Sequence, residues 1–441
     1  MNFPESFLET VRQHAQLLEV AQSLGISASG SGARTKLLCP FHDDTNPSMT
    51  IKDNRYRCWV CNEWGDAISL VSKVQSCEFP EAVKAVCSIS GIEMPQLASP
   101  RELSEAEKKG KQMEAVLSYT SAQFREALKV DQRAEAYAAA RGIDADVAER
   151  YAIGYAPRAS RWIPNQHRQE FLPLLKDLGL VREGKGGTDD FYGFFRDRII
   201  FPIRDARGRV NGFGGRIIDA ESNAQKYLNS PESTSFLKSD LLYGLYEGTE
   251  QGRQRQDVIF VVEGYTDVIA MTKAGFPACS PMGTAVSHNQ LRLLARWCQH
   301  VVFVFDGDKA GRRAAHESAS TCLGYAHLFG SIRFVELPEG TDPDTLIADD
   351  GPEAMAQALS KFVMLTDKLA AQYDEIFRSS GNARHIIRQQ FLESCVLPLS
   401  DCPSQITRDL VGSELAEAMG IEWAIIDRFL SQRAPKATIA S

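Results

Sequence analysis

The sequence lacks the features that would place a chain in a membrane or hold it together with disulfides. No uncharged apolar run reaches the roughly 18 residues that a membrane-spanning helix needs. Ten cysteines among 441 residues are too few for a secreted disulfide scaffold. The first residues, MNFPESFLETVRQHAQ, carry acidic side chains and predict neither a secretory signal nor a transit peptide. These absences favour a cytoplasmic protein without a membrane partner.

Other absences narrow the function further. The chain has no internal repeat, no long low-complexity tract and no Gly-x-x-x-x-Gly-Lys loop of the kind that helicases use. Its net charge of −8 gives no support for a nucleic-acid partner, although the distribution of charge, and not the sum, decides the local field. With 44% hydrophobic and 24% charged residues, the composition is that of a soluble globular chain of two to four domains.

Shifts in composition predict where one part of the chain gives way to the next. The segment 257–340 alternates apolar strands such as DVIFVVEG and HVVFVFDGD with helices, which indicates a mainly parallel α/β sheet. The parts in chain order are a compact unit with a Cys/His cluster (1–96), a polar linker entering a helix (97–114), a helical and then Gly- and Arg-rich region with short strands (115–256), the α/β segment (257–340) and a helical end (341–435). We therefore expect a multidomain α/β and α+β protein.

A Cys/His cluster lies near the N-terminus. Cys39 and His42 form one pair and Cys58 and Cys61 a second, each separated by two residues, so each pair can hold one metal ion from a tight turn. The intervening residues 43–57 are long enough for a hairpin that brings the pairs together. Three thiolates and an imidazole close a tetrahedron, which favours one structural Zn²⁺. A Cys-x-x-Cys redox site would leave Cys39 and His42 without a role.

Cations and aromatic residues surround this cluster. Such a mixture is typical of a surface on which bases of single-stranded nucleic acid stack and phosphates pair. An ordinary zinc-ribbon surface, with Trp59 packed against the hairpin, is an equally weighted alternative. The residues concerned are Lys36, Lys52, Arg55, Tyr56, Arg57 and Trp59.

The other cysteines are scattered through apolar or helical contexts. Because a free cysteine most often serves as a small buried hydrophobe, we predict that they fill protein cores. They are Cys77, Cys87, Cys279, Cys298, Cys322, Cys395 and Cys402.

Carboxylates follow two strands of the α/β segment. Glu263 ends the first strand, while Asp306 and Asp308 follow the second. Residues at the carboxyl ends of neighbouring parallel strands converge on one crevice, and clustered like charges are costly unless a cation lies between them. Oxygen ligands suit Mg²⁺, and a pair of such ions can activate a hydroxyl and stabilise a leaving pyrophosphate. The alternative is that these acids only form turns at the strand ends. Two such motifs in one α/β unit argue against that alternative.

These motifs resemble those of bacterial DnaG-type primases. The motifs Cys-Pro-Phe-His with a distant Cys-x-x-Cys, Glu-Gly-Tyr-x-Asp and Asp-Gly-Asp-x-Ala-Gly stand in that family's order, and the last two resemble the Toprim (topoisomerase–primase) fold. The segments FRDRIIFPIRDARGRVNGFGGR, KYLNSPES and LLYGLYEG also look like the primase polymerase core. The similarity runs from about residue 5 to 432. It implies a zinc-binding domain at 1–96, a polymerase core at 115–256, a Toprim domain at 257–340 and a helical subdomain at 341–435.

The resemblance also assigns roles to single residues. It implies that Cys39, His42, Cys58 and Cys61 hold zinc. It implies that Glu263, Asp306 and Asp308 bind catalytic Mg²⁺ or Mn²⁺, supported by Asp267, Asp342 and Asp344. Basic residues that would line the template and nucleotide groove are Arg141, Arg196, Arg198, Arg216, Lys226 and Lys238. The composition supports part of this, since residues 196–216 contain six arginines against two aspartates, although a solvated strand and loop face is the alternative for any single arginine.

The implied activity is de novo synthesis of short RNA primers on single-stranded DNA during replication. The implied partners are single-stranded DNA template, ribonucleoside triphosphates and the RNA–DNA primer duplex, with a replicative helicase and single-strand-binding protein as further candidates for a monomeric chain. The helical domain that docks on the helicase in such primases has no counterpart after ITRDLVGSELAEAMGIEWAIIDRFL. We therefore expect either a truncated chain or a phage, plasmid or mobile-element primase, in the bacterial cytoplasm or nucleoid.

Three rival functions use parts of the same pattern. A Toprim nuclease would hydrolyse DNA with the same carboxylates, but it needs neither the zinc unit nor the Arg-rich core. A topoisomerase needs a tyrosine nucleophile in a strand-passage domain, which no region resembles. An inactive nucleic-acid-binding paralogue would have lost the carboxylates, whereas Glu263, Asp306 and Asp308 are all present.

Overall fold

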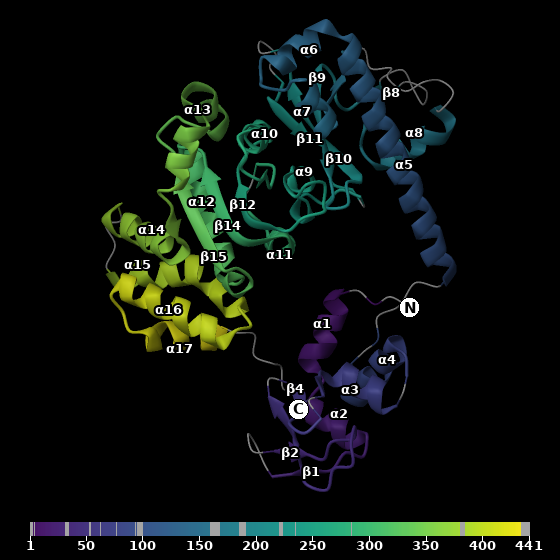
Figure 1. Cartoon of the computed structure of the whole chain (residues 1–441), viewed down its shortest axis with the longest axis vertical. Coiled ribbons are helices and arrows are strands. Elements are labelled where there is room, and N and C mark those ends of the chain that lie inside the picture. The colour runs from purple at the N-terminus through teal and green to yellow at the C-terminus, as the bar shows by residue number, and fades with distance from the viewer. Residues whose placement is uncertain are drawn as a thin grey trace. The chain divides into compact units, whose positions relative to one another are not determined.

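The structure is a computed structural model of the whole chain, and two compact units, Met1–Glu107 and Lys108–Ser441, are considered separately (Figure 1). No helix in the described part of the chain is long and apolar enough to cross a membrane. The residues that the structure describes are 3, 5–30, 35–52, 54–61, 63–75, 77–92, 94, 100–158, 168–184, 191–219, 224–233, 235–283, 285–379 and 384–433.

The N-terminal unit is a small antiparallel sheet covered by helices. The strands follow the order β1–β2–β3–β4–β5, and neighbouring strands are antiparallel throughout. Asp66 caps the amino end of α3 in a reciprocal pair with Ser69, and Gly91 ends α4 in the left-handed conformation. The elements are α1 (Glu5–His14), α2 (Leu17–Ser23), β1 (Ala28–Ser29), β2 (Lys36–Leu37), β3 (Met49–Lys52), β4 (Arg55–Cys58), β5 (Trp64–Gly65), α3 (Ala67–Val74) and α4 (Phe79–Ser90).

Most of the predicted linker is helical. Helix α5 (Pro100–Val130) contains the linker residues from 100 to 114, while residues 97–99 lie outside the described part. The run from Pro100 onwards is rich in Glu, Lys, Ala and Gln, which are good helix formers, and Pro100 stands at the first helical position where its missing N–H costs nothing. The polar composition that suggested a linker is therefore that of a helix whose residues 108–112 are exposed.

The second unit begins with an antiparallel sheet of order β11–β10–β9–β6. Ile200 and Phe213 bury one face of this sheet against α5, and Phe201 and Ile203 bury the other face in the core shared with the α/β segment. The elements of this part are α6 (Gln132–Ala139), α7 (Ala145–Arg150), β6 (Gly154–Ala156), α8 (Arg168–Asp177), β7 (Val181–Glu183), β8 (Phe191–Gly193), β9 (Arg198–Arg204), β10 (Val210–Ile217), β11 (Tyr227–Asn229), η3 (Lys238–Asp240) and α9 (Leu245–Gly248).

The α/β segment forms the predicted, mainly parallel sheet. Its order is β13–β12–β14–β15–β16, in which only β16 runs antiparallel to its neighbour. The predicted mixed α/β fold is confirmed. The elements are β12 (Gln256–Val261), α10 (Tyr265–Lys273), β13 (Ala278–Cys279), α11 (His288–Trp297), β14 (Cys298–Phe305), α12 (Lys309–Leu323), η4 (Ala326–Leu328), β15 (Ser331–Glu336), α13 (Pro343–Leu359) and β16 (Val363–Met364).

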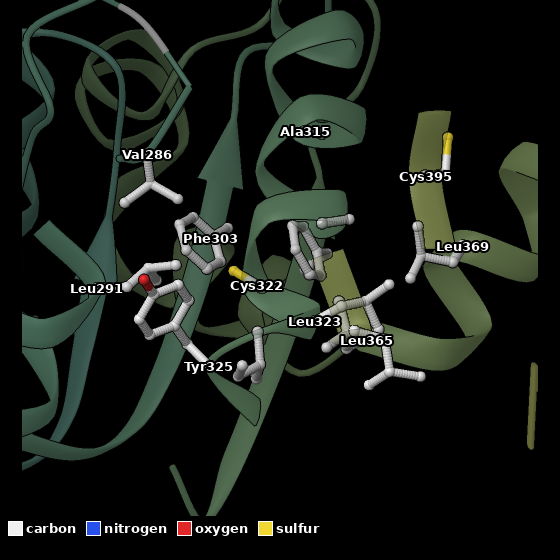
Figure 2. Packing of buried hydrophobic residues seen from close by; sticks show 14 of the residues in the cluster. Val286, Leu291, Phe303, Ala315, Cys322, Leu323, Tyr325, Leu365, Leu369 and Cys395 are labelled. Carbon is white, nitrogen blue, oxygen red and sulfur yellow. The ribbon is translucent and has the colours of Figure 1, made fainter. Parts of the chain in front are cut away.

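Both faces of this sheet are buried, as the continuous apolar strands predict. Along β14, Val301 and Phe303 pack into one core with α11 and α12, whereas Val302 and Val304 pack into the other with α10 and α13. Figure 2 shows Phe303 and the thiols of Cys322 and Cys395 within the first of these cores. The scattered cysteines are buried and free, as predicted, except that Cys77 is half-buried.

Helices complete the second unit, with one departure from the prediction. The strand β16 lies inside the end of the chain that we predicted to be helical (341–435), and α13 packs on α10 of the α/β segment. A strand of two residues at the sheet edge is too short to show an alternating pattern in the sequence. The remaining elements are α14 (Leu365–Ser379), α15 (Arg384–Phe391), η5 (Leu392–Val396), η6 (Leu397–Asp401), α16 (Gln405–Met419) and α17 (Trp423–Arg433).

Candidate functional site

The predicted zinc ligands meet at one point of the N-terminal unit. Ligand atoms of Cys39, His42, Cys58 and Cys61 all lie within 4.8 Å of one another. The Cys39 and Cys61 sulfurs are 3.6 Å apart, and His42 Nδ1 lies 3.9 Å from the Cys58 sulfur. Burial would raise the pKa of Cys58, but donors from the Ser48 hydroxyl and nearby amides lower it to about 6. A closed set of three sulfurs and one imidazole fits structural zinc.

Asp44 supports this site, and sequence reasoning missed it. Its Oδ2 accepts hydrogen bonds from the Cys39 amide (2.7 Å) and the Ser48 hydroxyl (2.7 Å). Its Oδ1 lies 3.8 Å from Nε2 of His42, whose other ring nitrogen, Nδ1, lies beside Cys58. A carboxylate on the outer nitrogen orients a ligating imidazole, and the position of Asp44 two residues after His42 is the only signal of it in the sequence.

We expect Asp44→Asn to lower zinc affinity roughly 10- to 100-fold, because it weakens the carboxylate contacts that orient His42 and the loop of Cys39. Competition with a colorimetric zinc chelator measures this change. The matched control is Asp43→Asn, which alters an exposed neighbouring carboxylate. Equal affinities for the two variants would show that Asp44 has no part in the site.

The sheet of the N-terminal unit carries a cationic and aromatic row. Register pairs Lys36 with Thr50, Thr50 with Arg57 and Arg57 with Trp64, so these residues cross the sheet side by side. Trp59 is 64% exposed, its indole nitrogen donates to Thr50 Oγ1 (3.0 Å), and the Arg57 guanidinium lies 4.6 Å from its ring centre. Trp59 thus contacts the hairpin yet stays largely exposed, which is compatible with both interpretations.

Two other members of the predicted surface need separate mention. Tyr56 is only 1% exposed and belongs to the core of the unit, so its inclusion in the surface was wrong. The alternation along β4 explains this, because Arg55 and Arg57 point outward and Tyr56 between them points inward. The side chain of Lys52 lies outside the described residues.

The main carboxylates stand at the ends of neighbouring parallel strands. Glu263 follows β12 and Asp306 follows β14, and the Asp306 amide donates to Glu263 Oε1 (2.9 Å). Asp308 caps the amino end of α12 by accepting from the Gly311 amide (2.7 Å). A Cβ atom at Gly311 would lie 2.8 Å from Glu263 Oε1, so glycine lets α12 approach the carboxylates.

The supporting acids join this group from α10 and α13. Asp267 accepts from the amides of Gly264 (2.9 Å) and Asp344 (3.4 Å), and Asp342 caps α13. Burial raises the pKa of Asp267 to about 7, with the negative charges of Asp342 and Asp344 adding to the shift. The predicted carboxylates therefore form one cluster that spans β12, β14, α10, α12 and α13.

The cluster has the donor set of a divalent-cation site. Oδ1 of Asp306 is buried and has no hydrogen-bond partner among the described residues. Burial, followed by the charges of Asp267 and Glu263, raises the pKa of Asp306 to about 8. An oxygen ligand without a partner among clustered acids fits an ion such as Mg²⁺, which would neutralise the repulsion. Glu263, Asp306 and Asp308 are the residues that would hold it.

Two of the predicted basic residues face this cluster. Arg216 is 4% exposed, and its guanidinium donates to the hydroxyls of Tyr137 (Nε, 3.1 Å) and Tyr227. Arg141 lies over the ring of Tyr137, 5.8 Å from its centre. Burial and Asp342 raise the pKa of Asp344, and the positive charges of Arg141 and Arg216 oppose that shift. The antiparallel sheet thus brings positive charge to the edge of the carboxylate cluster.

The other predicted groove residues differ in accessibility. Arg198 is 5% exposed and donates to the carbonyls of Gly215 (3.0 Å), Gln225 (2.8 Å) and Lys226 (3.2 Å), which ties β9 to the β10–β11 connection. This geometry argues against the predicted phosphate contact for Arg198. Arg196 and Lys226 are exposed beside tyrosine rings, and Lys238 is half-buried in η3.

Three family models match successive parts of the chain. Residues 3–102 match the CHC2 zinc finger, residues 123–249 match the DNA primase catalytic core, N-terminal domain, and residues 260–347 match the Toprim-like family. The fold and its two sites therefore define a protein that joins a zinc ribbon to a Toprim-like domain. Within that class, the chain belongs to the bacterial DnaG-type DNA primase family.

Two curated relatives illustrate the extent of the match. The DNA primase of Escherichia coli K12 is 32% identical over 450 residues, covering 98% of this chain and 74% of the relative. The DNA primase of Pseudomonas putida is 31% identical over 441 residues, covering 98% of this chain but 66% of the relative. The chain thus spans slightly less than two thirds of the length of the Pseudomonas primase.

Solved structures show the same likeness. The zinc-binding and RNA polymerase domains of the Aquifex aeolicus primase superpose with a TM-score of 0.59 at 26% identity, covering 95% of this chain and 98% of that chain. A DnaG primase catalytic domain bound to ssDNA gives a TM-score of 0.60 at 31% identity, covering 72% of this chain and 99% of that one.

Proposed function

We propose that the chain is a DNA-directed RNA polymerase that starts short RNA primers de novo on single-stranded DNA. The observation that carries the proposal is the unpartnered Oδ1 of Asp306 among clustered carboxylates, with Arg141 and Arg216 at their edge. Such a site suits nucleotidyl transfer, in which a bound cation neutralises charge while cationic side chains hold the triphosphate. Family membership supports the same reaction.

Each group of residues has a role in this proposal. Glu263, Asp306 and Asp308 would hold Mg²⁺ or Mn²⁺, which would polarise the α-phosphate and the attacking 3′-hydroxyl. Arg141 and Arg216 hold the triphosphate beside this cluster. Exposed Arg196 and Lys226 contact template phosphates, in a salt-dependent manner that does not depend on base sequence.

The partners follow from the same assignment. The proposed substrates are single-stranded DNA and ribonucleoside triphosphates, and the product is an RNA–DNA duplex. The DnaG catalytic domain that superposes on this chain was solved bound to ssDNA, which supports this choice of template. We further propose a monomer of the bacterial cytoplasm.

One incubation separates this function from its rivals. The full chain is mixed with single-stranded DNA, labelled ribonucleotides and Mg²⁺, and the products are resolved by size. We expect short template-dependent RNA and intact template. Template cleavage without RNA would favour a Toprim nuclease, and the absence of both products would favour a binding protein without catalysis.

A second candidate function, template binding by the zinc unit, rests on the exposed row of its sheet. We expect Trp59→Ala to weaken single-stranded DNA binding roughly 5- to 150-fold, because one stacked base contributes about 1–3 kcal/mol. Fluorescence anisotropy of a labelled oligonucleotide measures the affinity at fixed salt concentration. The control is Val60→Ala, which truncates a neighbouring side chain that is also exposed but has no ring. Equal affinities of both variants would remove Trp59 from the interface.

A further inference from the structure

Asp197 adopts an unusual backbone conformation at the start of β9. Its φ angle of 54° lies in the left-handed region, which residues other than glycine, asparagine and aspartate rarely adopt. The residue is 5% exposed and stands between the exposed Arg196 and the buried Arg198. A strained backbone conformation persists only where neighbouring residues hold it, so we expect specific contacts around Asp197.

Three residues from different elements hold Asp197. Arg133 at the start of α6 donates to both carboxylate oxygens, through Nη1 to Oδ1 (2.8 Å) and Nη2 to Oδ2 (3.1 Å). The Tyr155 hydroxyl of β6 donates to Oδ1 (2.9 Å), and the Ile218 amide donates to the Asp197 carbonyl (3.1 Å). Asp197 therefore fastens the first turn of α6 to the sheet.

Helix α6 connects Asp197 with the residues beside the carboxylate cluster. Tyr137 follows Arg133 by four residues and so lies on the same helical face, and its hydroxyl donates to the Ile217 carbonyl (3.2 Å). The same hydroxyl accepts from Arg216, and the Tyr137 ring lies under Arg141. One face of α6 and its following turn thus connects Asp197 to both cations that face Asp344.

We propose that Asp197 is a positioning residue for the triphosphate-binding cations. By holding Arg133, it fixes α6 on β9 and β10 so that Tyr137 can support Arg141 and Arg216 at the edge of the carboxylate cluster. The inference rests on the proposed function, because it assumes that these arginines bind the nucleotide. It assigns a role to a carboxylate that would not itself touch metal, nucleotide or template.

Two substitutions separate the ion pair from the backbone strain. Asp197→Gly retains the left-handed conformation without strain but removes both contacts to Arg133 and the contact to Tyr155. Arg133→Gln leaves Asp197 in place and breaks the ion pair from the other side, at a side chain that is 51% exposed. Because this second change is at the surface, it also serves if the glycine variant fails to fold.

The experiment measures kcat and KM for ribonucleotides in primer synthesis, together with binding of a fluorescent ATP analogue in the presence of Mg²⁺. We expect both variants to raise KM and weaken analogue binding about tenfold, with kcat changed less than about twofold. Adding Asp197→Gly to Arg141→Ala should cost less than the sum of the two single losses, because Asp197→Gly acts partly through Arg141 and partly through Arg216. Glu149→Gln, which removes the charge of an exposed acid paired with Arg125, should leave these values unchanged.

The outcomes distinguish this inference from the proposed function. Lower thermal stability with unchanged KM and analogue binding would show that Asp197 is only structural, and additive effects with Arg141→Ala would also overturn the inference. If the unmodified chain binds the analogue but makes no RNA, the proposed function fails. A tenfold loss of analogue binding in both variants would still support the positioning role.

Discussion

Asp306→Asn will lower primer synthesis at least about a thousandfold while the chain remains folded. The Oδ1 atom of Asp306 is buried without a hydrogen-bond partner among the described residues, and the Asp306 amide binds Glu263, so the residue joins both strand ends. An amide is a weaker and uncharged metal ligand. A bound cation stabilises such a transition state by several kcal/mol, and each ~1.36 kcal/mol lost lowers the rate tenfold. Incorporation of labelled ribonucleotides measures the loss.

The matched control for this change is Asp349→Asn, which removes the same charge from an exposed position on α13. It should retain synthesis within about twofold of the unmodified chain, since surface substitutions away from a site are usually close to neutral. If Asp306→Asn retained more than about a tenth of the activity, Asp306 would not be a metal ligand in the reaction.

The same variant has an expected effect on stability without metal. Burial raises the pKa of Asp306 to about 8 in the folded chain, so the folded state binds more protons than the unfolded state. Stability conferred by this carboxyl is therefore present at low pH and is lost as pH rises toward 8. In EDTA, the second unit of Asp306→Asn should melt at a higher temperature than that of the unmodified chain at pH 8, and the difference should shrink at pH 5. Thermal unfolding at both pH values tests this.

Cys58→Ala will abolish zinc binding and loosen the N-terminal unit. The Cys58 sulfur accepts hydrogen bonds from the Val60 amide (3.3 Å) and the Cys61 amide (3.4 Å) and lies beside His42. Structural zinc contributes about 10–16 kcal/mol of apparent binding free energy in small zinc peptides, so losing one of four ligands removes much of this stabilisation. Metal analysis should show less than about a tenth of the zinc, and limited proteolysis should cleave within the first unit.

Cys77→Ala is the control for the zinc variant. Cys77 is half-buried in the same unit and is not among the converging ligands, so the variant should keep its zinc and its resistance to proteolysis. A Cys58→Ala chain that kept full zinc occupancy would contradict the ligand assignment. Full occupancy with cleavage of the first unit would contradict the stabilising role of the metal.

The parts of the site that could be predicted are those encoded by local spacing. Two residues separate Cys39 from His42, and two separate Cys58 from Cys61, so a tight turn brings each pair onto one metal ion. The hairpin between the pairs then brings all four ligands together. Glu263 and Asp306 were predicted to meet because each follows an apolar strand, and parallel strands place their carboxyl ends at one edge. Both arguments need no knowledge of distant contacts.

The parts that escaped prediction depend on contacts between distant segments. Arg198 stands in a basic stretch, but its accessibility is decided by carbonyls of residues 215–226 across the sheet. In the sequence, Asp197 resembles an ordinary acidic residue of a turn. Only the fold shows its contacts with Arg133 and Tyr155, which are distant in the sequence. Period-two alternation could have identified Tyr56 as buried, since its strand neighbours are both arginines.

The most direct test of de novo primer synthesis uses each ribonucleoside triphosphate in turn labelled on its γ-phosphate, with single-stranded DNA, the other ribonucleotides unlabelled, and Mg²⁺. Only the first nucleotide of a new RNA chain keeps its γ-phosphate, so this label reports initiation and not extension. We expect γ-labelled short RNA that depends on template and disappears with Asp306→Asn. Incorporation of α-labelled but never γ-labelled nucleotide, or no RNA from a zinc-loaded chain, would contradict the primase assignment.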